Sequence, residues 1–360
     1  FSQSFDIVDR GIGTMADLNF GCQIALGFKE GPLDIMKRLG KTEVQRIMTR
    51  FQEDRPGFPV ATQPFEAYQA FHRYILTDDV DGVKIITIRR PQAMNALNDD
   101  VTDEICQVLE SSENDPAVKG FVITGFGNMA FSAGADIGRF PTMLGDKDAS
   151  MQYARDCAKV QRYMDQMNKP VVAALNGLAM GGGLEVAIRC HGIVSLEKAV
   201  LQFPEITLGI LPGIGGCVVP YRKWPQGAAL FHEMILFGKP VPATTAAEMG
   251  IINNLVKDPA DLIDAAVKEV QHFQDNIPRI SNAPVDIPEI SIPEMPMAGK
   301  QLLSKDAVGI TADTVRKASA ADDLETALEI GYAGFGDIAC SAAAKEGISA
   351  FLEKRKPKFK

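Results

Sequence analysis

The stretch that decides the fold is NGLAMGGGLEVA, residues 176–187. It follows the apolar run Pro170–Leu175, which predicts a buried strand, and its three consecutive glycines, Gly181–Gly183, lead into the start of a helix. Glycines at such a turn permit positive φ angles and let a ligand approach the backbone closely. Because free N–H groups and the positive end of the helix dipole face the turn, the stretch suits an oxyanion. Taken alone, it is equally typical of a tight packing turn.

Two glutamates lie near this turn in the sequence. Glu185 is predicted to lie in the first helical turn with Leu, Val and Ala as neighbours, so we expect apolar surroundings and a raised pKa for its carboxyl group. Glu205 follows in the segment QFPEI, residues 202–206. A lone glutamate is more often a surface or capping residue, but a carboxyl group with a raised pKa suits proton transfer.

Two further loops of small residues accompany the glutamates. FSAGADI, residues 131–137, follows the predicted strand Gly120–Thr124 and offers a second set of available N–H groups. LPGIGG, residues 211–216, follows Glu205 after a short spacer. The glycine-rich stretch is therefore one of several segments in this region that are rich in small residues.

The middle of the chain predicts an α/β fold. Val83–Ile88 is rich in β-branched residues and predicts a strand, whereas Asn98–Ser112 predicts an amphipathic helix. Strands that alternate with helices indicate a largely parallel sheet. After about residue 259 the chain becomes helical again. The Pro-rich stretch Pro278–Pro296 predicts extended chain over the surface, and two closing helices are predicted at Ala320–Tyr332 and Cys340–Arg355.

The first 75 residues differ in character from the rest. Apolar residues recur at helical spacing in Met15–Gly27 and Leu33–Leu39, and Gly31-Pro32 should break the chain between these helices. Arg55–Pro59 is typical of the start of a linker. A segment of this length buries little core, so we expect a helical appendage.

Composition excludes several functions. The net charge of −9 and pI near 5.1 argue against a nucleic-acid surface. Six scattered cysteines without a C-x-x-C pair favour free thiols in a reducing compartment, which we take to be the cytoplasm. None of the four histidines has ligand spacing from another, so we expect no metal site. No apolar run is long enough to span a bilayer, and no signal peptide is recognised.

Five motifs in order resemble the crotonase (enoyl-CoA hydratase/isomerase) superfamily. They are Arg90-Pro91 with Asn95–Asn98, the FSAGADI loop, the glycine-rich stretch, Pro204-Glu205, and Lys345–Phe351. The resemblance implies a crotonase-like spiral of ββα units over residues 76–258. A C-terminal helical region, residues 259–360, would serve trimer formation and coenzyme A contacts.

The resemblance also implies the chemistry. The backbone N–H groups of Ala135 and Gly182 would form an oxyanion hole for a thioester oxygen, where one donor is typically worth about 3–4 kcal/mol. Glu185 would activate water and Glu205 would protonate the α-carbon, although two coupled carboxyl groups titrate as a pair. The implied reaction is reversible hydration of a 2-trans-enoyl-CoA to a 3-hydroxyacyl-CoA, as in β-oxidation of fatty acids. No cofactor is expected, because coenzyme A is part of the substrate.

Substrate contacts are implied at six further positions: Ala133, Asp136, Ile137, Arg139, Phe351 and Lys354. The last two would reach the nucleotide of a neighbouring subunit in a homotrimer or dimer of trimers. A solvated tail is the alternative for the basic run Lys354–Lys360. Family members often carry Lys where this chain has Gln92 and Gly138, so the phosphate contacts would fall to Arg89, Arg90 or Arg139.

The N-terminal stretch resembles a second family. Ala16–Asn19 and Gly31–Met36 are similar to the C-terminal helical domain of 3-hydroxyacyl-CoA dehydrogenases. No strand followed by G-x-G-x-x-G is found, so we expect no binding of NAD or NADP. This implies the C-terminal part of a fused dehydrogenase–hydratase in which residues 1–75 are structural.

Three other functions stay open at this point. The chain could be an enoyl-CoA isomerase or a coenzyme A thioester hydrolase of the same superfamily, or a non-catalytic subunit of a multienzyme complex. Isomerases of the superfamily usually keep only the carboxylate at the Glu205 position, so the presence of Glu185 favours the hydratase. No motif fixes the walls of the acyl pocket, and hydration and dehydration share one transition state. Chain length and direction therefore cannot be predicted.

Overall fold

The computed structural model describes residues 1–359, so Lys360 of the basic run lies outside the described residues. The chain forms two compact units, Phe1–Arg73 and Tyr74–Lys360. They are called the N-terminal unit and the C-terminal unit below.

The N-terminal unit is helical, and both helices predicted there are present. Its elements are α1 (Ser2–Asp9), α2 (Met15–Leu26), α3 (Pro32–Leu39), α4 (Lys41–Asp54) and the 3-10 helix η1 (Phe65–Gln69). A small core forms around five buried side chains: Phe5, Leu33, Met36, Val44 and Tyr68.

A buried polar side chain holds two of these helices together. Asn19 of α2 accepts hydrogen bonds from the N–H groups of Leu33 (3.0 Å) and Asp34 (3.3 Å) at the start of α3. Its amide nitrogen donates to Asp34 Oδ2 at 2.6 Å, and Arg73 donates to the other oxygen of Asp34 at 2.7 Å. Asn19 therefore satisfies N–H groups that have no acceptor within their own helix.

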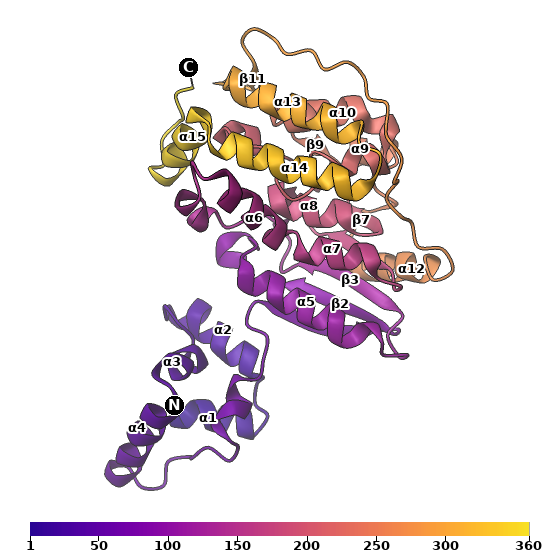
Figure 1. Ribbon diagram of the computed structural model, residues 1–360. Coiled ribbons are helices and arrows are strands. Elements are labelled where there is room, and N and C mark those ends of the chain that lie inside the picture. Colours follow the sequence, from indigo (N-terminus) through magenta and orange to yellow (C-terminus); the bar gives the residue numbers. More distant parts are fainter. Residues whose placement is uncertain (360) are drawn as a thin grey trace. The chain divides into compact units, whose positions relative to one another are not determined.

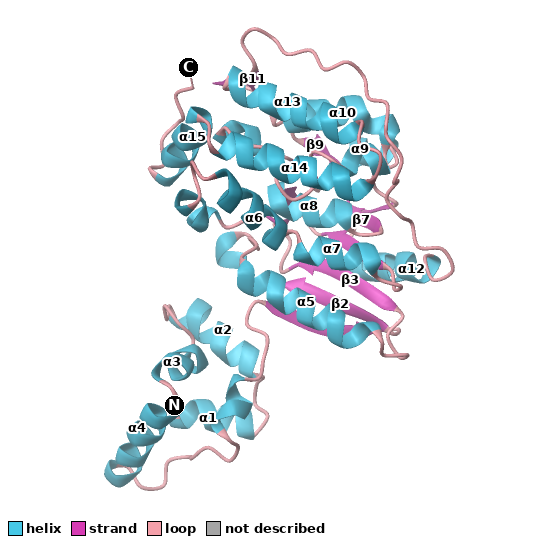
Figure 2. Cartoon of the chain, in the orientation of Figure 1, coloured by secondary structure: helices cyan, strands magenta, loops and turns pink. Residues whose placement is uncertain are grey.

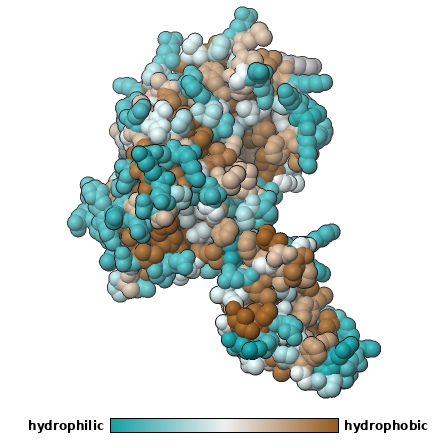
Figure 3. Space-filling view, turned by 180° about the vertical axis from the view of Figure 1, so that it is seen from behind, coloured by the Kyte–Doolittle hydropathy of each residue, from teal (hydrophilic) through white to brown (hydrophobic). Residues whose placement is uncertain are grey.

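The surface of this unit is partly apolar. Ile24, Leu26 and Phe28, at the end of α2 and just beyond it, are 56%, 65% and 46% exposed. Apolar side chains are visible on this unit in the space-filling view (Figure 3). The helix α2 buries only Asn19, so it contributes little to its own unit's core.

The main sheet of the C-terminal unit has six strands in the order β1-β2-β3-β5-β7-β10 (Figure 2). Their bounds are Ile75–Val80, Val83–Ile88, Gly120–Gly125, Val171–Leu175, Gly192–Leu196 and Asn254–Val256. All neighbouring pairs are parallel except β1 and β2. The predicted α/β class and the three predicted strands are confirmed. Apolar residues of β2 and β3 enter two different cores, which explains why apolar side chains lie on both faces of these strands.

A second, four-stranded sheet carries the loops that form the site. Its order is β4 (Ala130–Ser132), β6 (Leu178–Met180), β8 (Val200–Gln202) and β9 (Val241–Pro242). Each of the first three follows a strand of the main sheet, as β3-β4, β5-β6 and β7-β8. This repetition is the expected spiral of ββα units. The ends of β4, β6 and β8 lead directly into the FSAGADI loop, the glycines and Glu205.

Helices surround the two sheets (Figure 1). They are α5 (Asp99–Glu113), α6 (Lys147–Cys157), α7 (Lys159–Gln166), α8 (Gly181–Arg189), α9 (Val219–Lys223), α10 (Ala228–Phe237), α11 (Ala243–Glu248), α12 (Leu262–His272), α13 (Lys305–Ser319), α14 (Leu324–Ala339) and α15 (Ala342–Leu352). Short 3-10 helices lie at η2 (Pro91–Ala93), η3 (Ile137–Thr142), η4 (Glu205–Leu208), η5 (Pro225–Gly227) and η6 (Pro259–Asp261), and a small hairpin at β11 (Met297–Ala298) and β12 (Gln301–Leu302).

Two predictions for the C-terminal region need correction. The helix predicted at Ala320–Tyr332 is α14, which begins four residues later, at Leu324. Its true start is set by Asp323, whose side chain accepts a hydrogen bond from Thr326 N, while Ala320 ends α13. The helix predicted at Cys340–Arg355 is the shorter α15, capped by Ser341.

The Pro-rich stretch is extended, as predicted. Residues 278–296 contain no helix or strand. Arginines from elsewhere fix it through its carbonyl groups: Arg222 donates to Ala283 O at 2.9 Å and Arg316 to Ile290 O at 3.0 Å. These bonds explain how a segment without its own ladder remains ordered.

Candidate active site

The FSAGADI loop presents one N–H group to a cavity. Ala135 forms an isolated parallel bridge with Leu97, in which Leu97 N donates to Gly134 O (2.8 Å) and Asp136 N donates to Leu97 O (2.7 Å). Gly134 O and Asp136 N, on either side of Ala135, are therefore both occupied by hydrogen bonds to Leu97. In an extended backbone the N–H of Ala135 itself points to the opposite side, and it has no acceptor among residues 1–359.

The start of α8 supplies a second N–H group. Gly181 and Gly182 are the first two residues of the helix, and N–H groups of the first turn have no intrahelical acceptor. A Cβ atom on Gly182 would lie 3.3 Å from Ala135 N, so the two backbones approach closely. Within the described part of the chain, Gly182 N also lacks an acceptor. Ala135 and Gly182 line the same cavity, and together they have the geometry of an oxyanion hole.

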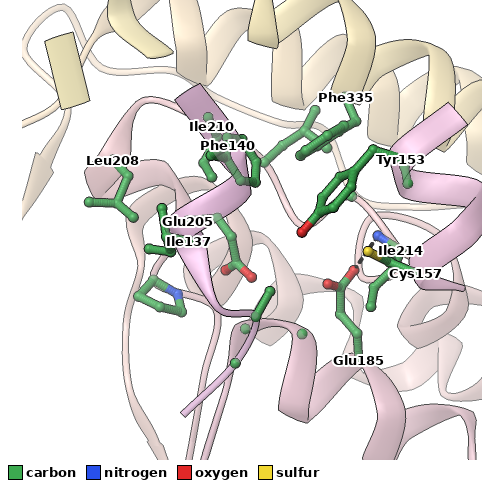
Figure 4. A pocket seen from close by; sticks show the side chains of 18 of the residues that line it. Ile137, Phe140, Tyr153, Cys157, Glu185, Glu205, Leu208, Ile210, Ile214 and Phe335 are labelled. Carbon is green, nitrogen blue, oxygen red and sulfur yellow. Dashed lines mark hydrogen bonds between the residues drawn. The ribbon is translucent and has the colours of Figure 1, made fainter. Parts of the chain in front are cut away.

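Glu185 is buried on the inner face of α8. It is the fifth residue of the helix, at the start of the second turn, so the predicted first-turn position is wrong by about one residue. The three glycines belong to the helix itself, so Glu185 lies further along the helix than predicted. Its Oε1 accepts hydrogen bonds from Ile214 N (2.8 Å) and Gly216 N (2.7 Å) of the LPGIGG segment (Figure 4).

Glu205 faces the same cavity from the start of η4 (Figure 4). Its Oε2 is inaccessible to solvent and has no hydrogen-bond partner among the described residues. Gly181, with φ of +48°, makes room for this carboxyl group, since a Cβ atom there would lie 2.7 Å from Glu205 Oε1. The glycine is therefore required both by backbone conformation and by the nearby acid.

The two carboxyl groups differ in their electrostatic surroundings. Burial raises the pKa of Glu185 to about 7, opposed by the two backbone donors and by the cation of Arg189 one turn further along α8. Burial and the charge of Glu185 together raise the pKa of Glu205 well above its ordinary value. We therefore expect Glu185 to ionise first while Glu205 keeps its proton. Carboxyl groups with separated pKa values are typical of an acid and a base acting together.

The side chain of Arg189 is held in place by an acidic residue of α7. It donates to Asp165 of α7 through Nε at 2.7 Å, and its guanidinium is almost fully buried. Its Nη1 lies 3.2 Å from the position that a Cβ atom on Gly215 would occupy. Gly215 stands between the two residues that donate to Glu185. Arg189 thus lies behind the loop that holds the carboxylate.

The cavity around these groups has a volume of about 100 Å³. Ala133 and Ile137, predicted as substrate contacts, both line it. Its walls also include residues that sequence reasoning missed: Phe140, Tyr153, Cys157, Leu208, Ile210 and Phe335. These come from four separate segments and belong to no motif, so no sequence signal pointed to them.

A second, more polar cavity of about 360 Å³ adjoins the first and shares Ala135, Gly182, Tyr153, Cys157 and Ile214 with it. Asp136 and Arg139, also predicted as substrate contacts, line this outer cavity. Arg139 pairs with Asp99, and its guanidinium lies 5.5 Å from the centre of the Tyr153 ring.

Of the arginines considered for phosphate contacts, Arg139 is the exposed one. Its side chain is 59% exposed, whereas that of Arg90 is 13% exposed and donates to Ala96 O (2.7 Å) and Asp136 (3.2 Å). Arg89 is buried. Phe351 and Lys354 line neither cavity; Phe351 is 51% exposed near the end of α15, and Lys354 follows that helix. Their suggested contact with a neighbouring subunit remains a prediction.

The structure offers no candidate metal centre. Across residues 1–359, no group of three or more His, Cys, Asp or Glu side chains is placed to hold a metal ion. In the same residues, no helix has the length and hydropathy needed to cross a bilayer.

Comparison with known proteins gives a consistent result. The sequence model of the enoyl-CoA hydratase/isomerase family matches residues 78–286. The chain is 33% identical to a probable enoyl-CoA hydratase of Bacillus subtilis over 77% of its own length and 95% of the relative. It is also 33% identical to a short-chain-enoyl-CoA hydratase of Clostridium acetobutylicum, over 78% of this chain and 95% of that one. A solved enoyl-CoA hydratase/isomerase structure from Xanthobacter autotrophicus superimposes with a TM-score of 0.58 and 26% identity, covering 79% of this chain and 94% of the other.

Proposed function

This chain belongs to the enoyl-CoA hydratase/isomerase family, and we propose that it is an enzyme that reversibly hydrates 2-trans-enoyl-CoA thioesters to 3-hydroxyacyl-CoA. The observation that carries the proposal is the pair of carboxyl groups, Glu185 and Glu205, that face one cavity beside the N–H groups of Ala135 and Gly182, which have no acceptor in the described residues. A single carboxyl group would favour an isomerase, whereas here both positions are occupied and face one cavity.

The geometry suggests how hydration proceeds. The thioester oxygen accepts hydrogen bonds from Ala135 N and Gly182 N, which draws electrons away from the double bond. The ionised Glu185 takes a proton from water as the water oxygen bonds to the β-carbon. Negative charge then develops on the thioester oxygen, where the two donors stabilise it. Glu205 delivers its proton to the α-carbon, and one proton passes back from Glu185 to Glu205 before the next turnover.

The local environments support this division of roles. Glu185 is held by two backbone donors, which stabilise its charged form as a base requires. Glu205 has an oxygen with no partner in the described residues and lies next to a like charge, which favours its protonated form as an acid requires. Water attack and protonation are thus assigned to different carboxyl groups on physical grounds.

The proposal extends to assembly, cofactor and location. We propose that the protein assembles as a homotrimer or a dimer of trimers and that it needs no cofactor. Its reaction would form part of a reaction sequence of the fatty-acid β-oxidation type. Exposure of Phe351 supports a role between subunits. The six cysteines carry no disulfide, which supports a reducing compartment such as the cytoplasm. The N-terminal unit would be the C-terminal helical part of a dehydrogenase domain fused to the hydratase, with a structural role and no NAD binding of its own.

The deciding experiment is a spectrophotometric assay with crotonyl-CoA. Hydration removes the conjugated double bond, so its absorbance should fall with time. Isomerase activity is tested with a 3-enoyl-CoA, which would gain this absorbance, and hydrolase activity is tested by release of free thiol. Inactivity with every 2-enoyl-CoA would overturn the proposal and favour a non-catalytic subunit.

A further inference from the structure

The two cavities differ in polarity, which fixes the direction of a bound thioester. The inner cavity is walled by aliphatic and aromatic side chains apart from the catalytic carboxyl groups, Tyr153 and Cys157. The outer cavity contains Asp99, Asp100, Asp136 and Arg139. Because Ala135 and Gly182 line both, the thioester carbonyl lies at the junction. The acyl chain then enters the inner cavity, and the polar coenzyme A portion leaves through the outer one.

Two phenylalanines form part of the wall of the inner cavity. Phe140 of η3 and Phe335 of α14 meet edge to face, with ring centres 5.4 Å apart, and each is 4% exposed. Phe335 packs directly on the backbone of Gly213, where a Cβ atom would lie 2.4 Å from its ring. The ring of Phe335 is therefore held from both sides.

The size of the cavity sets the length of chain that fits. Its volume of about 100 Å³ is smaller than the roughly 150 Å³ apolar cavity that holds benzene in an engineered protein. The α- and β-carbons occupy the part beside Glu185 and Glu205. We infer that this chain is a short-chain hydratase that accepts acyl groups of about four carbons, with Phe335 and Phe140 as the wall that excludes longer ones.

This inference rests on the proposed function, and a chain-length series tests it. Rates would be measured with 2-enoyl-CoA substrates of four, six and eight carbons. Because one methylene in a closed apolar pocket changes kcat/KM by about 10–200-fold, the four-carbon substrate should exceed the eight-carbon one by about 100-fold or more. Phe335→Ala should raise the ratio of eight-carbon to four-carbon kcat/KM at least about tenfold.

A matched control separates the wall from general loosening. Phe231 of α10 is 2% exposed, packs on Tyr221 with ring centres 5.7 Å apart, and lines neither cavity. Phe231→Ala should leave the chain-length ratio unchanged. If Phe335→Ala does not fold, Phe335→Leu is measured instead and should shift the ratio in the same direction. Equal rates of the wild type on four and eight carbons would overturn the inference and leave hydration intact. No activity at any length would instead overturn the proposed function.

Discussion

A glycine makes room for a polar side chain in each unit of this protein, but with different consequences. In the N-terminal unit, a Cβ atom on Gly31 would lie 2.0 Å from Asn19 Oδ1; in the C-terminal unit, one on Gly181 would lie 2.7 Å from Glu205 Oε1. Asn19 uses its amide in three hydrogen bonds. Glu205 keeps an inaccessible oxygen without a partner among residues 1–359.

The comparison shows how to distinguish a structural polar group from a reactive one. A buried amide whose oxygen and nitrogen both have hydrogen-bond partners stabilises the fold and has little left to offer a ligand. A buried carboxyl group without its bonds costs free energy, so its presence indicates a role outside folding. Asn19 and Glu205 both lie next to a glycine, but they differ in how many of their polar atoms have a hydrogen-bond partner. Four predictions follow from this difference, in order of expected effect.

The carboxyl groups should give the largest effect. We expect Glu185→Gln and Glu205→Gln each to lower kcat by about 10²–10⁴-fold, because each removes one proton transfer. KM should change little, since the N–H groups of Ala135 and Gly182 are untouched. The double variant should be much less than multiplicatively worse, because one loss already disables the shared step. Near-normal hydration by Glu185→Gln alone would show that a single carboxyl group suffices, as in an isomerase.

Gly181→Ala should lower kcat by about 10²-fold, because its Cβ atom would displace the Glu205 carboxyl group and misplacement by about 1 Å costs this much. The variant also strains a backbone with φ of +48°. Gly309→Ala in α13 is the control, since a Cβ atom there meets nothing within 4 Å. It should keep full activity and stabilise the protein by up to about 1 kcal/mol. Equal rates for the two variants would contradict the assigned contact.

The pH dependence of kcat/KM should be bell-shaped. Below about pH 7 the rate should fall tenfold per pH unit as Glu185 takes up a proton, and at alkaline pH it should fall as Glu205 loses its own. Arg189→Met removes a cation that favours ionised Glu185, so the pKa should rise and the acid limb should move to higher pH. Arg162→Met, which breaks a surface pair with Glu325, is the control. An acid limb unmoved by Arg189→Met would exclude this electrostatic role.

Asn19→Ala should have the smallest effect and no effect on catalysis. It leaves the buried N–H of Leu33 without its acceptor, which destabilises the N-terminal unit by about 1–3 kcal/mol. Hydrogen exchange in α2 and α3 would report the loss, while kcat with crotonyl-CoA should be unchanged. Asn114→Ala, at an exposed helix end, should alter neither measurement. A fall in kcat with Asn19→Ala would mean that the unit takes part in the reaction.

The local sequence was enough to predict an element where one segment determines its own structure. Val83–Ile88 was predicted with its observed bounds, because an apolar β-branched run has few other conformations in a buried sheet. For α13 the sequence predicted only that the chain is helical again after about residue 259, without bounds. Thr311 and Thr314 satisfy their hydroxyl groups by donating to Ala307 O (2.7 Å) and Ile310 O (2.8 Å), one turn earlier. Such bonds exist only once the helix has formed, so the local sequence does not show them.

The sequence by itself determined the family, the α/β fold and the groups that bear on chemistry: the glycines, the two small-residue loops and the two glutamates. These are local motifs, and their order along the chain is sufficient to identify them. The tertiary structure alone decided that Glu185 has two backbone donors and that Phe140 and Phe335 meet in the wall of the cavity. It also decided that one oxygen of Glu205 has no partner among residues 1–359. Burial, hydrogen bonding and cavity shape depend on segments far apart in the sequence, which come together only when the chain folds.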